Sequence, residues 1–189
     1  MSLEIKRERH GFVTVALDAH EVMVVRSACD QLGELFESRE SADVVGGVAP
    51  VEVIPGVLDP FADSGPKTRP QDPALARLLP DAYPDDADAT GEFRRYSEAD
   101  VLAFKRGNLR TMLGTLGEGA EPIRLDQAQV QSWLYAINDL RLTIGTRLDL
   151  EEGYSEVMAA LPQEDPRLPL FYLYEWLSAL QDGLVRVAK

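Results

Sequence analysis

The sequence has little of the residues that bind metals or cross-link small folds. Its 189 residues include one cysteine, Cys29, and two histidines, His10 and His20. A single cysteine excludes a disulfide within these residues and favours a reducing compartment. Two histidines and a cysteine on an apolar helical stripe do not make a metal-ligand set. We therefore predict no metal and no cofactor.

Long hydrophobic runs and an excess of cations are missing as well. The first ten residues lack the apolar core of a signal peptide, and no uncharged run approaches the ~18 residues of a membrane span. The 19 Lys and Arg stand against 32 Asp and Glu, a net charge of −13. Such a chain repels nucleic acid and anionic lipid unless its cations cluster. We expect a soluble, cytoplasmic protein whose partners are neither nucleic acids nor membranes.

Sequence signatures of common enzymes are also missing. No phosphate-binding Gly-x-x-x-x-Gly-Lys-Ser/Thr, Gly-x-Ser-x-Gly or His-Glu-x-x-His motif occurs, so no catalytic residue is predicted. Asp86, Asp88, Thr90 and Gly91 match the first half of a calcium loop. The bidentate Glu at position 12 is replaced by Ser97, so we interpret the stretch as a solvated acidic turn that leads into a helix.

Hydrophobic periodicity predicts a mainly α fold. Residues 3–17 have the alternation of a β-hairpin that turns at His10 and Gly11. The next helix begins at a capping box of Asp18 and Glu21. Its apolar stripe is Val22, Val25, Cys29, Leu32 and Phe36. Further helices are expected over 72–79, 97–116, 126–148 and 154–161, and from Pro166 or Pro169 to Val187. The sequence predicts a single domain, 1–189, in which a helical bundle packs on an N-terminal β-hairpin.

One stretch interrupts this helical pattern. Ten of residues 41–73 are Gly or Pro, a density that excludes a regular helix. Residues 41–70 are therefore predicted to form an irregular Gly/Pro-rich excursion. Its many valines are too apolar for a free linker, which makes residues 41–66 a candidate surface for a partner.

Polar residues inside the helix at 126–148 are candidate binding residues. Asp139 falls beside the apolar stripe, and Arg141 lies within reach of Asn138. We favour a structural role, in which these residues form a buried ion pair or amide network with Glu175 or Asp182. The alternative is a polar pocket around Asp139, Arg141 and Glu175. The same helix contains Gly145, which predicts the close approach of another backbone.

The last helix is apolar over more than one stripe. It contains four aromatic residues, among them the candidate binding residue Trp176. A helix that is apolar nearly all round is either the central helix of a bundle or packs on a partner. We favour the central position. A surface for another protein, or for a second copy in a homodimer, is the alternative.

Three stretches carry a family resemblance: DPALARLLPDAYPDD (72–86), NDLRLTIGTRLDL (138–150) and FYLYEWLSALQDGLV (171–185). In this order they resemble an uncharacterised actinobacterial family, a domain of unknown function often encoded beside the ClpS adaptor of the Clp protease. The resemblance implies no catalytic residues. It implies an association with regulated proteolysis.

These observations favour a non-catalytic protein-interaction or regulatory module whose partner is another protein. The alternative is an enzyme or small-molecule binder, which requires Asp139, Arg141 and Glu175 to converge on an open pocket. A direct DNA regulator would need a clustered basic face and a recognition helix.

Overall fold

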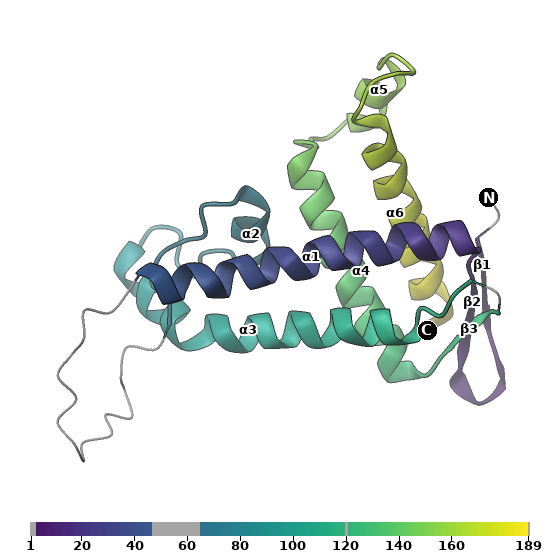
Figure 1. The fold of residues 1–189 in the computed structure, drawn as a ribbon, viewed down its shortest axis with the longest axis horizontal. Helices are drawn as coiled ribbons and strands as arrows, with labels where there is room; N and C mark the ends of the chain where they lie inside the picture. Colours follow the sequence, from purple (N-terminus) through teal and green to yellow (C-terminus); the bar gives the residue numbers. More distant parts are fainter. Residues whose placement is uncertain (1–2, 47–64, 120, 189) are drawn as a thin grey trace.

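Six α-helices and a small sheet make up the described part of the chain, residues 3–46, 65–119 and 121–188 of a computed structural model. The two longest helices, α1 (Ala19–Gly46) and α3 (Ala87–Thr115), lie side by side, and α4 (Gln127–Arg147) and α6 (Leu168–Ala188) cross them steeply (Figure 1). The short helices are α2 (Pro73–Leu78) and α5 (Tyr154–Ala159). The predicted mainly α fold is confirmed. None of the described helices combines the length and the apolarity that crossing a membrane requires.

The sheet has three antiparallel strands at one end of the molecule (Figure 1): β1 (Glu4–Arg7), β2 (Val13–Ala16) and β3 (Ile123–Leu125). The predicted hairpin is β1–β2, with His10 and Gly11 at positive φ in its turn. Because side chains alternate along a strand, Val13 and Val15 are buried while Thr14 faces outward. The strand β3, only three residues long, was not predicted.

Helix α1 begins as predicted. The Asp18 carboxylate accepts from the Glu21 amide at 2.8 Å, and the Glu21 carboxylate accepts from the Asp18 amide at 2.9 Å. All five residues of the predicted stripe are buried: Val22, Val25, Cys29, Leu32 and Phe36. The helix continues to Gly46, so the prediction of irregular structure is wrong for residues 41–46, where the Gly and Pro residues have not yet begun to recur. Residues 47–64 lie outside the described residues. The predicted excursion and its role as a partner surface therefore stay predictions for that stretch.

Helix α3 begins ten residues earlier than predicted, so the interpretation of Asp88, Thr90 and Gly91 as part of an acidic turn before the helix is wrong. The Asp86 carboxylate caps the helix by accepting from the Ala89 amide at 2.9 Å. One turn later, the Thr90 hydroxyl donates to the Tyr83 carbonyl at 2.7 Å and accepts from the Tyr83 amide at 3.1 Å. These contacts fix the first turn. The stretch that matches the first half of a calcium loop is therefore the start of α3.

The central helix is α4 rather than α6. It contacts α1, α2, α3, α6 and β3, whereas α6 packs mainly on α4 and β1. The buried face of α6 includes Leu177, Leu180 and Leu184, and Tyr172 on its other face is 61% exposed. The prediction that the last helix is central is therefore wrong, and part of its aromatic surface is left uncovered.

Candidate functional site

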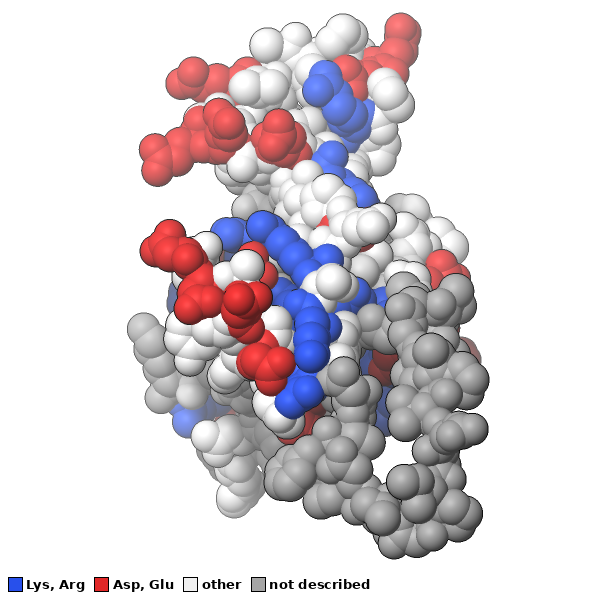
Figure 2. Space-filling view, turned by 90° about the vertical axis from the view of Figure 1, so that its left-hand side faces the viewer, with Lys and Arg blue, Asp and Glu red and all other residues white. Residues whose placement is uncertain are grey.

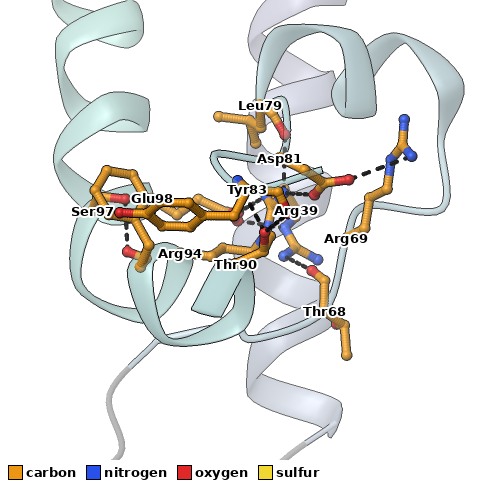
Figure 3. A network of polar contacts seen from close by, with 11 residues as sticks. Arg39, Thr68, Arg69, Leu79, Asp81, Tyr83, Thr90, Arg94, Ser97 and Glu98 are labelled. Carbon is orange, nitrogen blue, oxygen red and sulfur yellow. Dashed lines mark hydrogen bonds and ion pairs between the residues drawn. The ribbon is translucent and has the colours of Figure 1, made fainter. Parts of the chain in front are cut away.

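A buried ion-pair network joins α1 to α3 (Figure 3). Glu98 of α3 accepts from Arg39 of α1 at 2.6 Å and from Arg94, one turn earlier, at 2.5 Å. A second bond from Arg94 reaches Asp81, in the loop before α3, at 2.8 Å. Arg39, Arg94 and Glu98 are each at most 7% exposed.

Backbone groups complete this network. Arg39 donates to the Thr68 carbonyl at 2.8 Å, and Arg94 donates to the Leu79 carbonyl at 3.1 Å. The exposed Arg69 also reaches Asp81, at 3.5 Å, so three guanidinium groups face the two carboxylates of Asp81 and Glu98 (Figure 3). We interpret the network as a clamp that holds the 65–86 segment against α1 and α3, because Arg39 and Arg94 each bind both Glu98 and a group of that segment.

The predicted polar residues of α4 point in different directions. Asp139 and Arg141 are two positions apart, about 200° around a helix. Asp139 is buried and accepts from Lys105 of α3 at 2.7 Å. Burial raises the pKa of Asp139 above its ordinary value, because desolvation outweighs the attraction of Lys105.

Arg141 faces α6 on the other side of α4. Its guanidinium donates to the Ser178 hydroxyl at 2.8 Å, to the Gln181 amide oxygen and, at 3.4 Å, to the Tyr174 hydroxyl. These neutral groups stand where an ion pair with Glu175 or Asp182 was expected. Glu175 instead accepts from Tyr154 of α5, and this bond is the largest cause that raises the pKa of Tyr154 to about 12. The structure therefore does not bring Asp139, Arg141 and Glu175 together.

A small hollow lies beside Arg141, with a volume of about 350 Å³. We call it the arginine pocket. Polar groups come from Arg77 on α2, Asn138 and Arg141 on α4, and Tyr174 on α6. The predicted site residues Asn138 and Arg141 thus share one pocket. Gly145 also lines it, and a methyl group there would contact the Tyr174 ring at 3.6 Å, so the close neighbour is a side chain rather than the predicted backbone.

A larger, mostly apolar groove lies between α1, α4 and α6, with a volume of about 1250 Å³. The predicted site residue Trp176 lines it. We call it the apolar groove, and its apolar lining comprises Met23, Val24, Ala28, Leu32, Leu35, Leu140, Ile144, Pro166, Pro169, Leu170, Tyr172, Leu173 and Trp176. Met23 and Tyr172 are 59% and 61% exposed, so large apolar side chains face solvent here.

Acidic groups accompany this apolar surface. Glu21 lines the groove and accepts from the Trp176 indole nitrogen at 3.3 Å, which orients the ring. Glu34 also lines it and is exposed. The basic lining residue Arg147 pairs with Asp72 at 2.6 Å. The uncompensated charge around the groove is therefore negative.

The cysteine is not part of either hollow. Cys29 is fully buried in the core, and burial raises the pKa of its thiol to about 12. A thiol with so high a pKa is a poor nucleophile, because the thiolate is the reactive form. Among the described residues, no group of three or more His, Cys, Asp or Glu side chains is placed to hold a metal ion.

Sequence reasoning predicted Trp176 and the aromatic helix as candidate surface residues but missed the groove itself. The signal available was the exposed side of α1, where Met23 and Val24 lie outside the buried stripe. The ion-pair network was also missed. Arg39 and Glu98 are 59 residues apart, and nothing in a single sequence indicates that two such distant residues are in contact.

Comparisons with known proteins complete these observations. A family profile described as "Domain of unknown function (DUF2017)" matches residues 2–188. The "Putative oxidative stress regulator AosR" of Mycobacterium leprae is 32% identical over 179 residues, 88% of this chain and 77% of that protein. The "Oxidative stress regulator AosR" of Mycobacterium tuberculosis is 29% identical over 185 residues, 91% of this chain and 80% of that protein. No solved structure matches the chain.

Proposed function

The chain belongs to the DUF2017 family, and from this premise we propose that it is a non-catalytic regulatory protein that binds another protein in the apolar groove. The names of its mycobacterial relatives, which call them regulators of oxidative stress, support a regulatory role. The single observation that carries the proposal is the groove itself, an open apolar concavity between three helices.

The occupant that fits best is an amphipathic helix of the partner. Such a helix lays an apolar face into a hydrophobic groove and anchors it with side chains spaced three or four residues apart. Exposed Met23 and Tyr172 supply large contact surfaces of the kind enriched at protein interfaces. The exposed Glu34 favours a partner helix whose apolar face is flanked by Lys or Arg, because complementary charges steer association.

Two other functional classes have less support. The enzyme hypothesis needs Asp139, Arg141 and Glu175 to converge, and these residues contact three different groups of neighbours. Direct nucleic-acid binding needs a broad basic face. On the face in Figure 2, Lys and Arg side chains form a narrow stripe bordered by acidic ones, and the whole chain carries a charge of −13.

The setting of this regulation is part of the proposal. We place the protein in the cytoplasm, in keeping with its single unpaired cysteine. If the gene lies beside that of the ClpS adaptor, as the resemblance implies, the partner is a component of regulated proteolysis. The response to oxidants suggested by the relatives' names would then come from the partner, because Cys29 is buried and has no second cysteine in the chain.

Site-specific photo-cross-linking in cells tests the proposal. A photoreactive p-benzoylphenylalanine in place of Met23 projects into the groove, and the same group in place of Phe104, 55% exposed on α3, is the matched control. We expect position 23 to capture a basic amphipathic helix of another protein, identified by mass spectrometry of the linked peptide, and position 104 not to capture it.

Three results would overturn the proposal. One is the absence of any adduct at position 23. A second is a linked peptide that is acidic or lacks helical apolar spacing. The third is an adduct with a second copy of this chain, which would assign the groove to a homodimer instead.

A further inference from the structure

We propose that the arginine pocket binds a small organic molecule through a single carboxylate group. The proposal is independent of the partner in the apolar groove, because the two hollows lie on different sides of α4. Residues Asn138, Arg141, Leu142 and Gly145 line the pocket, whereas Leu140, Thr143, Ile144 and Arg147 line the groove.

The first observation is that Arg141 lacks a counter-ion. The buried cations Arg39 and Arg94 and the half-buried Lys105 each contact a carboxylate. Arg141 is half-buried, yet within the described ranges its side chain meets only the neutral groups of α6 and no carboxylate within ion-pair distance. Burying a cation costs less free energy when an anion is paired with it. A bound ligand can supply that anion to Arg141.

These neutral contacts also orient the guanidinium. The Nε of Arg141 is held by Ser178 at 2.8 Å, and the Tyr174 ring lies 5.2 Å from the guanidinium carbon. A planar guanidinium held in this way binds a carboxylate with less loss of side-chain entropy than a freely rotating one. The pocket is thus partly organised before a ligand arrives.

A second guanidinium faces the same hollow. Arg77 of α2 is exposed, and no hydrogen bond or ion pair of its side chain occurs among the residues that the structure describes. The exposed amide of Asn138 adds a neutral donor beside them. Two cations and an amide around one small space are the donors that a carboxylate accepts from.

The rest of the lining limits the charge and shape of the ligand. Asp149 also lines the pocket, so its formal charges are two positive and one negative, a net of +1. That net charge matches one carboxylate and disfavours a doubly charged phosphate. Leu142, Leu150 and the Tyr174 ring provide apolar contacts for the remainder of the molecule. A volume of about 350 Å³ lies at the small end of the range of ligand pockets and is large enough to admit a small aromatic carboxylate such as benzoate.

Titration of the ¹⁵N-labelled protein with benzoate, followed by NMR, tests the proposal, with inorganic phosphate in a parallel titration. We expect saturable benzoate shifts centred on the amides of residues 138–150, with a dissociation constant in the millimolar range. The Arg77→Gln substitution should weaken binding at least threefold. It removes an exposed side chain that makes no hydrogen bond or ion pair with the described residues, so the variant should remain folded.

Further variants make the outcome decisive. Arg141→Gln should abolish saturation, whereas Arg110→Gln, at an exposed position of α3, should leave the affinity unchanged. The proposal is overturned if benzoate gives no saturable shift, if Arg77→Gln binds as the unmodified chain does, or if phosphate moves the same amides with equal affinity. Equal weakening by Arg110→Gln would also overturn it, because it would indicate attraction to the protein as a whole.

Discussion

Glu98 holds two buried guanidinium groups at once, and its removal would leave both without their shared carboxylate. We predict that Glu98→Ala lowers the free energy of unfolding by about 3–5 kcal/mol, measured by urea denaturation. The matched control is Glu92→Ala on the same helix. Glu92 pairs with Lys67 and Arg95 but its side chain is 54% exposed, so its loss should change stability by less than about 1 kcal/mol. Similar values for the two variants would contradict the clamp.

Asp72 connects α2 to α4 with a single carboxylate. It caps α2 by accepting from the Ala74 and Leu75 amides at 2.8 and 3.1 Å, and it pairs with Arg147. Desolvation raises the pKa of Asp72, but the hydrogen bonds from Arg147, Leu75 and Ala74 together outweigh it, so the pKa lies below its ordinary value of 3.8. The ionised group therefore stabilises the fold above that pH, and the contribution is lost as the pH falls through the lowered pKa.

The Asp72→Asn substitution isolates this charge, because Asn also caps helices well. We predict that it destabilises the protein by up to about 1 kcal/mol at pH 7 and that the difference shrinks as the pH falls below 3.8. Thermal unfolding of both proteins across this range measures the difference. A difference that stays constant with pH would show that the charge of Asp72 has no part in stability.

The only thiol of the chain gives a chemical prediction. Because Cys29 is fully buried and its pKa is raised to about 12, Ellman's reagent should not react with the native protein at pH 7–8 and should titrate one thiol after unfolding. Brief exposure to hydrogen peroxide should likewise leave the mass of the native chain unchanged. Rapid labelling of the folded protein would contradict this and would restore Cys29 as a candidate sensor of oxidants.

At the scale of elements, two glycines near the end of α3 have opposite roles. Gly119 has φ +80°, and a Cβ there would lie 2.5 Å from the Ala19 backbone nitrogen at the start of α1. Gly114, inside α3, has open space around it. We predict that Gly119→Ala destabilises the protein by at least about 2 kcal/mol, and that Gly114→Ala stabilises it by about 0.5–1 kcal/mol, as determined by thermal unfolding. A neutral Gly119→Ala would mean that the chain between α3 and β3 adjusts without strain.

The elements that could be predicted are those whose signal is local. The Asp18–Glu21 capping box and the stripe from Val22 to Phe36 determine α1, and alternation around His10 determines the hairpin. The start of α3 could not be predicted in this way. Its first turns are polar on most faces and are held by contacts with Tyr83 and Asp81, two residues that precede the helix. These contacts form only in the folded chain.

At the scale of the whole molecule, the candidate binding surfaces depend on how helices cross. The apolar groove exists because α6 packs on α4 and β1 while α1 runs alongside α3, which leaves an angle between α1 and α6 (Figure 1). Periodicity identifies an apolar face on each helix but not the crossing angle, so Trp176 could be named as a candidate and the groove could not. The same reasoning applies to Arg141, whose partners on α6 follow from helix packing rather than from sequence spacing.

The affinity of the cross-linked partner segment, as a synthetic peptide, tests the central claim most directly. Fluorescence anisotropy would compare the unmodified chain with a Met23→Ala/Tyr172→Ala variant and with a Phe93→Ala/Phe104→Ala control, all four side chains being more than 50% exposed. We predict at least a tenfold loss of affinity in the groove variant, because buried aromatic and Met anchors dominate such interfaces, and no change in the control. Equal affinity in all three proteins, or a loss confined to the α3 variant, would contradict the assignment of the apolar groove as the partner site.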